Sequence, residues 1–307
     1  EGAILGARAA YIGGAIGTAC TIVDRDFNIP ALGTMAHSWV QLFPTELEAF
    51  RAYARLYPDN CVLLVDTYNV LKSGVPNAIK VFNEEVVPRG FRPKGIRIDS
   101  GDISYLSKEA RKMLDEAGFH DCPIVASSSL DEYVIRDLLN QGAKIDSFGV
   151  GERLITARSE PVFGGVYKLT AVEEDGEIIP KIKVTTPGFK QVYRLYDKAT
   201  NKAIADVVTL HDEEIDESKP YEIFHPLFTW KRKTLTNFYA RKLLVKIFDK
   251  GECVYECPPI DDIRDYCAKE IETLWEEVRR FENPHEYFVD LSKPLWDIKD
   301  RLLKEYE

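Results

Sequence analysis

The segment 95–102, Gly-Ile-Arg-Ile-Asp-Ser-Gly-Asp, combines residue types that suit an anion or a divalent cation. Arg97 offers the planar pair of donors that binds phosphate or carboxylate, and the carboxylates Asp99 and Asp102 suit Mg²⁺ or ribose hydroxyls. The β-branched run predicts a strand ending at Asp99. The apolar spacing from Ile103 predicts a helix whose free N–H groups favour an anion. The alternative is a capped helix beside a salt-bridged arginine, because Asp-Ser-Gly-Asp is common in turns.

Polar or small residues also end three other strands predicted in the first half of the chain. These strand ends are Asp66-Thr67, Ser127-Ser128-Ser129 and Gly149-Val150-Gly151. Because parallel strands end at one edge of a sheet, these residues are expected to converge there. The serines supply donors and the glycines let the backbone approach an anion, so the four strand ends predict a phosphate and sugar cradle. Ordinary loops are the alternative interpretation.

His37 is the most distinctive titratable residue. It lies in the segment 33–39, Gly-Thr-Met-Ala-His-Ser-Trp, which predicts a loop of small residues that a ligand can approach. A histidine there suits a general base or a nucleophile toward phosphoryl groups. Asp66 is a candidate to orient it through its other ring nitrogen. A packed histidine hydrogen-bonded to backbone is the alternative.

The elements that would position these residues alternate between strand and helix in the first half. The expected strands are 17–23, 61–67, 95–99, 123–127 and 147–150, and the expected helices are 3–12, 44–57, 77–87, 103–117 and 131–141. This order predicts right-handed crossovers and a parallel sheet, either open or closed into a barrel.

The second half changes to hairpins followed by helices. Strands 166–172 and 178–184 flank Asp175-Gly176, strands 191–196 and 203–210 flank a second turn, and helices are expected at 260–280 and 294–306. The predicted domains are therefore residues 1–160, an incomplete parallel α/β barrel carrying the active-site strand ends, and residues 161–307, hairpins and helices that belong to a second domain.

The bulk composition limits the possible partners. The chain has 307 residues, 45% hydrophobic residues and a net charge of −10, so a sizeable core is expected and extended nucleic-acid contact is not. No stretch approaches the length of a membrane span, so no membrane partner is expected. The six scattered cysteines predict a reduced, cytoplasmic protein without a zinc site. The apolar helical stripe at residues 3–11, with no initiator methionine, indicates a fragment of a longer protein.

Several segments resemble the nicotinate phosphoribosyltransferase family in order and spacing. They are residues 6–14, 33–40, 65–68, 97–102, 127–131, 148–151 and 283–292. The resemblance implies a type II phosphoribosyltransferase fold, an irregular TIM-like α/β barrel beside an α/β sandwich, usually as a homodimer. It implies ATP-coupled synthesis of nicotinate mononucleotide from nicotinate and phosphoribosyl pyrophosphate, the first step of NAD salvage from nicotinate. This is glycosyl-transfer chemistry classed as a ligase, with ATP as co-substrate and Mg²⁺ as the expected cofactor.

The resemblance also implies residue roles. His37 matches the histidine that ATP phosphorylates, with Asp66 in support. The substrate-binding set is Thr18, Arg97, Asp99, Ser100, Gly101 and Asp102, and the phosphate-binding set is Ser128, Ser129, Gly149 and Gly151. The family carries a Phe-Gly-x-Arg-Arg segment just upstream of the position of Gly2, and the present sequence does not include it.

Two other functions remain as alternatives. The first is nicotinamide phosphoribosyltransferase, in which the turn matching residues 17–20 carries an aspartate that accepts from the amide. Here Ala19-Cys20 offers no acid, and a nearby carboxylate would repel nicotinate. The second is a non-catalytic fragment that needs the missing N-terminal part, which exposed apolar surface on helix 3–12 would favour.

Overall fold

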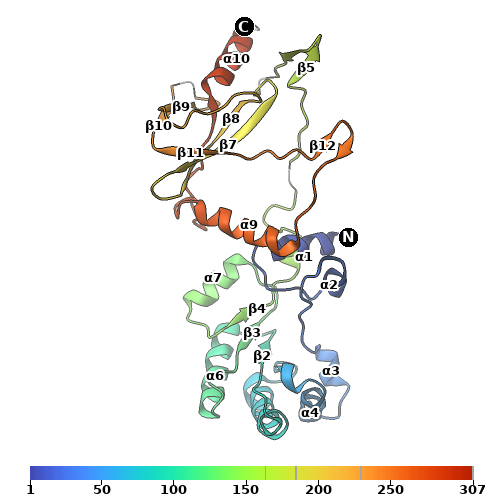
Figure 1. Cartoon of the computed structure of the whole chain (residues 1–307). Helices are drawn as coiled ribbons and strands as arrows, with labels where there is room; N and C mark the ends of the chain where they lie inside the picture. The colour runs from blue at the N-terminus through green and yellow to red at the C-terminus, as the bar shows by residue number, and fades with distance from the viewer. Residues whose placement is uncertain (163, 184, 229, 306–307) are drawn as a thin grey trace. The chain divides into compact units, whose positions relative to one another are not determined.

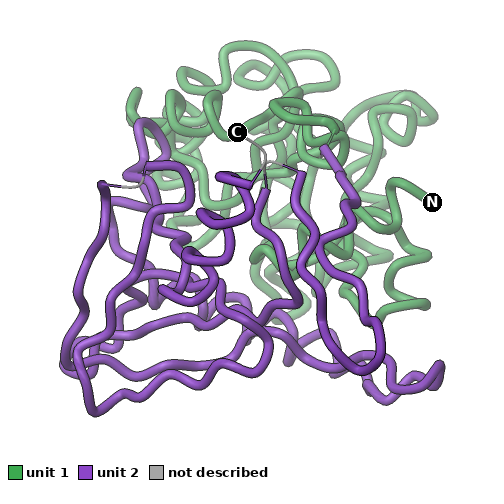
Figure 2. The backbone as a smooth tube through the Cα atoms, turned by 90° about the horizontal axis from the view of Figure 1, so that it is seen from above, with its two compact units in different colours: residues 1–163 green, residues 164–307 purple. Residues whose placement is uncertain are grey.

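The chain forms two compact units, Glu1–Phe163 and Gly164–Glu307 (Figure 1, Figure 2). The computed structural model describes residues 1–162, 164–183, 185–228 and 230–305. Each unit has its own sheet and its own buried core, and each is described by itself below.

Unit 1 is built on a four-stranded parallel sheet with the strand order β1-β2-β3-β4. The strands are β1 (Val62–Leu64), β2 (Gly95–Ile98), β3 (Ile124–Ala126) and β4 (Ser147–Phe148). In register, Leu64 pairs with Arg97, and Ile98 pairs with Ala126. The four predicted strands from residue 61 onward are confirmed, although each is shorter than expected, and their carboxyl ends share one edge.

Helices follow each strand, as the alternating pattern predicts. The α-helices of unit 1 are α1 (Gly2–Ile12), α2 (Thr21–Phe27), α3 (His37–Gln41), α4 (Glu46–Leu56), α5 (Val75–Val81), α6 (Ile103–Glu116), α7 (Glu132–Asn140) and α8 (Glu152–Ile155). Short 3₁₀ turns lie at η1 (Pro58–Asn60) and η4 (Val87–Arg89). Leu63, Ile96 and Ile124 of the sheet are fully buried, as is typical of parallel strands covered on both faces.

The strand predicted at residues 17–23 is wrong. Thr18 makes only a single bridge with Ala31, and α2 begins at Thr21. The Thr18 hydroxyl accepts the N–H of Cys20 at 3.1 Å, and this local bond turns the chain out of the extended conformation.

The helix predicted at residues 77–87 is part of a longer, irregular helical segment. Two π-helical turns, η2 (Val70–Gly74) and η3 (Phe82–Val86), flank α5. A Cβ atom on Gly74 would lie 1.9 Å from the carbonyl oxygen of Val65, so only glycine lets η2 pack against the chain that follows β1. The turn η2 therefore lies directly beside the residues that end this strand.

Unit 2 has a six-stranded sheet in the order β10-β9-β14-β8-β7-β11. Its strands are β7 (Lys190–Asp197), β8 (Ala203–Leu210), β9 (Tyr221–Phe224), β10 (Arg232–Leu235), β11 (Phe238–Lys242) and β14 (Val289–Ser292). The predicted hairpin of β7 and β8 is confirmed, and β14 adds to β8 in parallel. The helix α10 (Lys293–Lys304) follows β14, and the predicted end of this helix at residue 306 lies outside the described residues.

Two smaller hairpins complete unit 2: β5 (Ala171–Glu174) with β6 (Glu177–Pro180), and β12 (Phe248–Asp249) with β13 (Glu252–Cys253). Asp175 and Gly176 both have positive φ, 52° and 83°, as an Asp-Gly hairpin turn requires. The first hairpin is therefore confirmed. Its second strand ends earlier than predicted, at Pro180, and residue 184 lies outside the described residues.

The helix predicted at residues 260–280 ends early. It is α9 (Ile260–Thr273), and Leu274 is already extended with ψ of 151°. Lys202, in the turn between β7 and β8, donates to the carbonyl of Glu272 at 2.6 Å and to that of Leu274 at 3.4 Å. Its side chain therefore caps the end of α9. Sequence periodicity does not reveal such a tertiary contact.

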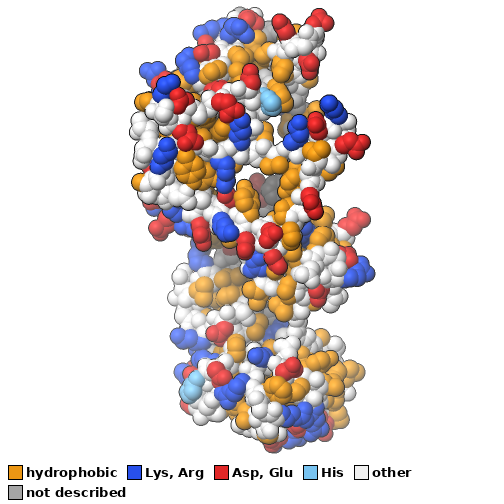
Figure 3. Space-filling view, viewed as in Figure 1, with side chains coloured by type: hydrophobic (Ala, Val, Ile, Leu, Met, Phe, Trp, Pro, Cys, Tyr) orange, Lys and Arg blue, Asp and Glu red, His pale blue; other side chains and the backbone are white. Residues whose placement is uncertain are grey.

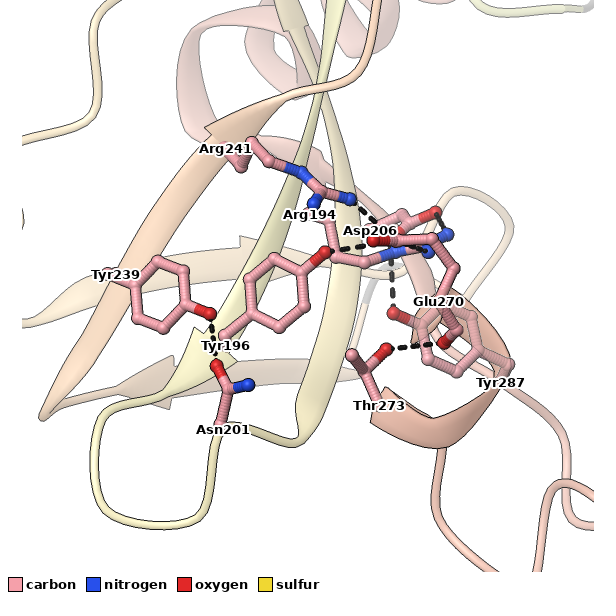
Figure 4. A network of polar contacts seen from close by, with 9 residues as sticks. All are labelled: Arg194, Tyr196, Asn201, Asp206, Tyr239, Arg241, Glu270, Thr273 and Tyr287. Atoms are coloured by element: carbon pink, nitrogen blue, oxygen red, sulfur yellow. Dashed lines mark hydrogen bonds and ion pairs between the residues drawn. The ribbon is translucent and has the colours of Figure 1, made fainter. Parts of the chain in front are cut away.

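A polar network attaches α9 to the sheet of unit 2 (Figure 4). Arg194 forms a bidentate pair with Asp206 at 2.8 and 2.9 Å, and its Nη1 lies 3.1 Å from Glu270 of α9. Arg241 also donates to Glu270, at 2.5 Å. Burial raises the pKa of Tyr196 to about 12, and this hydroxyl donates to the same carboxylate at 3.2 Å. The carboxylate of Glu270 is thus held by three donors from the sheet.

The surface of the molecule mixes acidic and basic side chains with scattered hydrophobic ones on the face drawn in Figure 3. In the part of the chain that the structure describes, none of the helices combines the length and apolarity needed to span a membrane.

Candidate functional site

The carboxyl ends of β2, β3 and β4 surround a recess of about 320 Å³ in unit 1. The end of β2, the loops after the three strands and the start of α8 supply its lining: Arg97, Asp99, Ser127, Ser128, Ser129, Leu130, Gly149, Gly151, Glu152 and Arg153. Six of the residues singled out from the sequence therefore meet at one edge of the sheet, namely Arg97, Asp99, Ser128, Ser129, Gly149 and Gly151.

Arg97 is held by three neighbours before any ligand arrives. Its Nε donates to Ser127 Oγ at 2.8 Å, its Nη1 donates to Thr34 Oγ1 at 2.9 Å, and its Nη2 lies 3.2 Å from Asp99 Oδ2. The Ser127 hydroxyl in turn donates to Asp99 Oδ1 at 2.5 Å. The guanidinium is fixed in direction yet remains about one quarter exposed, at 26%, so it can still donate to a bound anion.

Asp66 is buried, with a side chain that is only 1% exposed. Its Oδ2 accepts from the backbone N–H of Asp99 at 3.1 Å and from the Ser100 hydroxyl at 2.6 Å. Its Oδ1 has no hydrogen-bond partner among the described residues and lies 3.9 Å from Nε2 of His37. One oxygen of this carboxylate therefore fixes the loop after β2, and the other faces the histidine.

His37 is the first residue of α3, so the prediction that it lies in a loop is wrong. The helix begins at His37 because Ala36 is the last extended residue and its carbonyl accepts the N–H of Trp39. The ring Nδ1 lies 3.1 Å from Thr67 Oγ1, and Nε2 lies 3.6 Å from Asp99 Oδ2. Thr67, rather than Asp66, is within hydrogen-bonding distance of the ring.

The loops after β3 and β4 form the opposite wall of the recess. Ser128 and Ser129 both have positive φ, 96° and 47°. Gly149 packs closely, because a Cβ there would lie 3.3 Å from Ser127 Cβ, whereas a Cβ on Gly151 would meet open space. The backbone at Gly151 is therefore accessible from the recess.

Arg153 brings a second cation to this wall. Its Nη1 pairs with Asp131, and its Nε is buried with no hydrogen-bond partner among the described residues. The pKa of Asp131 is lowered, chiefly because the N–H of Val134 donates to this carboxylate and also because Arg153 pairs with it. Partial burial opposes this shift but does not reverse it. Two guanidinium groups, those of Arg97 and Arg153, therefore line the recess.

Sequence reasoning missed two residues of this arrangement, Thr34 and Arg153. It named Thr67 and Ser127 as part of the predicted strand ends but gave neither of them a contact or a role of its own. Arg153 follows Gly151 closely in the sequence. Thr34 carries no signal, since its contact with Arg97 joins residues far apart in the chain.

Four other predicted residues lie elsewhere. Ser100 and Gly101 line a second recess, of about 340 Å³, together with Asp66 and the start of η2. Asp102 lines neither recess and accepts the N–H of Tyr105 at 3.0 Å, so it is the cap of α6, as in the alternative interpretation. Thr18 also lines neither, and its hydroxyl is used in the turn before α2.

Comparison with known proteins places this chain in a family. The family model described as "Nicotinate phosphoribosyltransferase C-terminal domain" matches residues 189–299. The nicotinate phosphoribosyltransferase of Bacillus subtilis (strain 168) is 47% identical over 100% of this chain and 65% of its own length. That of Dictyostelium discoideum is 35% identical over 98% of this chain and 60% of its own length. The chain belongs to the nicotinate phosphoribosyltransferase family.

A solved structure also supports membership of the nicotinate phosphoribosyltransferase family. The crystal structure of human nicotinic acid phosphoribosyltransferase matches with a TM-score of 0.79 and 25% identity, over 97% of this chain and 66% of that one. The crystal structure of nicotinate-nucleotide pyrophosphorylase from Pyrococcus furiosus shares the fold, with a TM-score of 0.61 and 23% identity over 87% of this chain and 61% of that one. The predicted α/β, type II phosphoribosyltransferase fold is confirmed.

The chain spans less than two thirds of the length of the two curated relatives, 65% and 60%.

Proposed function

We propose that this chain carries catalytic machinery for making nicotinate mononucleotide from nicotinate and phosphoribosyl pyrophosphate, coupled to ATP hydrolysis. The observation that carries this proposal is the recess lined by Arg97, Arg153 and Asp99, with His37 Nε2 lying 3.6 Å from Asp99 Oδ2. Two guanidinium groups and an accessible glycine backbone suit a phosphorylated sugar. A family member with this arrangement is expected to keep the family's reaction.

At the ribose, the ring nitrogen of nicotinate forms a bond to C1′ while the bond from C1′ to the pyrophosphate oxygen breaks. The protein does not supply the nucleophile for this step. Its residues hold the two reactants in line and offset the negative charge that gathers on the leaving pyrophosphate. Thr34, Ser127 and Asp99 already hold the side chain of Arg97. Binding of the pyrophosphate by Arg97 therefore costs little further side-chain entropy.

His37 is proposed to accept a phosphoryl group from ATP. A ring nitrogen lone pair attacks the γ-phosphorus, an N–P bond forms, and the bond to the β–γ bridging oxygen breaks to release ADP. Asp66 and Asp99 face Nε2, so they stabilise the positive charge that develops on the ring. The later release of this phosphoryl group to water would couple ATP hydrolysis to nucleotide formation.

The two carboxylates also suit Mg²⁺, the expected cofactor. Asp66 Oδ1 is a buried oxygen with no hydrogen-bond partner in the described part of the chain, and the side chain of Asp99 is 25% exposed. Mg²⁺ commonly binds one or two protein carboxylates together with substrate phosphates. We propose that Asp66 and Asp99 hold the ion, which would offset phosphate charge when bound.

The acid nicotinate, rather than the amide nicotinamide, is the proposed substrate. The segment 17–20, Gly-Thr-Ala-Cys, carries no carboxylate that could accept from an amide or repel an acid. Equal or faster turnover of nicotinamide would favour the alternative enzyme.

We also propose that the protein acts as a homodimer in the cytoplasm. Large apolar side chains of the segment around β12 and β13 are exposed, including Leu244, Val245, Phe248 and Val254, and a second copy would cover them. The six cysteines of the chain are free thiols in the structure, which suits a reducing compartment.

The decisive experiment measures nicotinate mononucleotide formation by the intact protein and by its Arg97→Ala variant. Loss of a charged hydrogen-bond donor costs about 1.5–3 kcal/mol, so KM for phosphoribosyl pyrophosphate or nicotinate should rise by about 10- to 100-fold. Arg92→Ala is the matched control, because Arg92 forms an exposed ion pair with Asp121. Absence of product from the wild type, or an unchanged KM for both substrates in Arg97→Ala, would overturn the proposal.

A further inference from the structure

The two nitrogen atoms of His37 face different chemical groups. Nδ1 lies 3.1 Å from the hydroxyl of Thr67, which follows Asp66 directly in the segment after β1. Nε2 faces two carboxylate oxygens, Asp99 Oδ2 at 3.6 Å and Asp66 Oδ1 at 3.9 Å. The ring is therefore bordered by a neutral hydroxyl on one edge and by negative charge on the other.

The hydroxyl of Thr67 is the closer of these restraints. The carboxylate oxygens lie beyond normal hydrogen-bonding distance of Nε2, so they do not fix the ring plane. His37 is 39% exposed and starts a helix of only five residues, so little packing restrains its side chain. A half-turn of the ring about the Cβ–Cγ bond would place a carbon atom where each nitrogen now lies. The hydrogen bond to Thr67 opposes this half-turn.

We propose that Thr67 is a positioning residue that fixes the orientation and the tautomer of His37. The hydroxyl of Thr67 accepts from protonated Nδ1, so the lone pair of the ring lies on Nε2, the nitrogen that is free to attack phosphorus. This hydrogen bond persists when Nε2 forms its new bond and the ring becomes positively charged, because Nδ1–H still donates to the hydroxyl. The importance of this role for turnover rests on the proposed phosphorylation of His37, but the orientation itself does not.

The first test reads the ring directly. Long-range ¹H–¹⁵N correlation spectra of the intact, ¹⁵N-histidine-labelled protein distinguish the two tautomers, and the signals of His37 are assigned by their loss in His37→Asn. We expect protonated Nδ1 in the wild type and in Thr67→Ser, which keeps the hydroxyl. Thr67→Val should give averaged shifts of a mixed population. Signals of Thr67→Val that match those of the wild type would overturn the proposal.

The second test measures the rate of acid-labile ³²P transfer from γ-labelled ATP. Loss of one positioning hydrogen bond should slow labelling about ten-fold in Thr67→Val, while Thr67→Ser stays close to the wild type. Thr209→Val is the matched control, because Thr209 is buried in unit 2 and its hydroxyl donates to the carbonyl of Leu210 at 2.9 Å. Equal labelling rates of Thr67→Val and Thr209→Val would contradict a positioning role.

The two tests separate failure of this inference from failure of the proposed function. If the wild-type protein takes up no label, phosphorylation of His37 is wrong, and the tautomer spectra still decide the role of Thr67. If the wild type is labelled and Thr67→Val changes neither the spectra nor the rate, only the positioning role is wrong.

Discussion

The carboxylate of Asp66 uses its two oxygens differently. Oδ2 accepts two hydrogen bonds from the loop after β2, whereas Oδ1 is buried and has no partner among the described residues. An unpaired buried oxygen costs about 1–3 kcal/mol, so a proton donor or cation that reaches Oδ1 recovers this energy. His37 Nε2 lies 3.9 Å from Oδ1 and is one candidate partner when it carries a proton, and a bound Mg²⁺ is another. The carboxylate of Asp66 is therefore stabilised most when a proton donor or a cation lies beside Oδ1.

At the same scale, His37→Asn is expected to abolish ATP stimulation and leave slow, ATP-independent formation of nicotinate mononucleotide. The physical reason is that asparagine cannot form the N–P bond but preserves a polar side chain at the start of α3. Acid-labile ³²P labelling and turnover with and without ATP are the measurements. The exposed His120 supplies the control His120→Asn. Labelling or ATP stimulation that persists in His37→Asn would contradict the proposal that ATP phosphorylates His37.

Among the elements, η2 matters because it lies against the chain that carries Asp66. A methyl group on Gly74 would overlap the Val65 carbonyl oxygen at 1.9 Å, a distance that backbone atoms cannot accommodate without moving. We predict that Gly74→Ala lowers the free energy of unfolding by at least about 1–3 kcal/mol, the usual cost of overpacking. Urea titration is the measurement.

The control for this prediction is Gly33→Ala. A Cβ on Gly33 meets no atom within 4 Å, and its φ is not in the left-handed region, so its free energy of unfolding should change little. If Gly74→Ala and Gly33→Ala have the same stability, the close approach of η2 to Val65 does not constrain the fold.

The start of α7 gives a prediction about pH. Asp131 caps this helix by accepting from Val134 N at 2.8 Å, and its lowered pKa means that the folded state binds the proton less tightly than the unfolded state. Its contribution to stability is therefore fully present above the unfolded pKa of about 3.9 and is lost as the pH falls through the folded value. Asp131→Asn keeps the capping oxygen but loses the charge that pairs with Arg153.

We accordingly expect Asp131→Asn to be less stable than the wild type near pH 7, and this difference to shrink below about pH 4. Urea midpoints between pH 3 and pH 7 measure it. Asp137→Asn is the control, because Asp137 is an exposed acid of the same helix with a side chain that is 63% exposed. If the stability difference between the wild type and Asp131→Asn grew as the pH fell, the predicted direction of the pH dependence would be wrong.

At the scale of the whole molecule, unit 2 has the features of an independently folding domain. Its six-stranded sheet buries Leu195, Val207 and Phe238 in a core of its own, and the network around Glu270 attaches α9 to the same sheet. We predict that residues 164–307 expressed alone unfold cooperatively. Circular dichroism during urea titration tests this, with Leu195→Ala, which should cost about 2–5 kcal/mol, as the check on a packed core. A gradual loss of signal with no transition would contradict independent folding.

The sequence by itself determined the alternation of strands and helices, the parallel order of the four strand ends and the two hairpins around Asp175-Gly176 and β7–β8. These features depend on local patterns: continuous apolar runs for strands buried on both faces, and an Asp-Gly pair that takes positive φ cheaply. The sequence also indicated Asp66 and Arg97 together, because strand ends of a parallel sheet converge, and it paired His37 with Asp66 as a candidate orienting carboxylate.

Only the tertiary structure decided which partner each side chain has. Thr67 with His37, Thr34 with Arg97, and Glu270 with Arg194 are contacts between residues at least 30 positions apart, so no local period encodes them. The helix at residues 21–27, the early end of α9 and the π-turn at Gly74 likewise follow from particular hydrogen bonds or close approaches. Periodicity reports which face of an element is apolar, whereas these contacts depend on how separate elements are placed against each other, and that placement is set by packing of the whole unit.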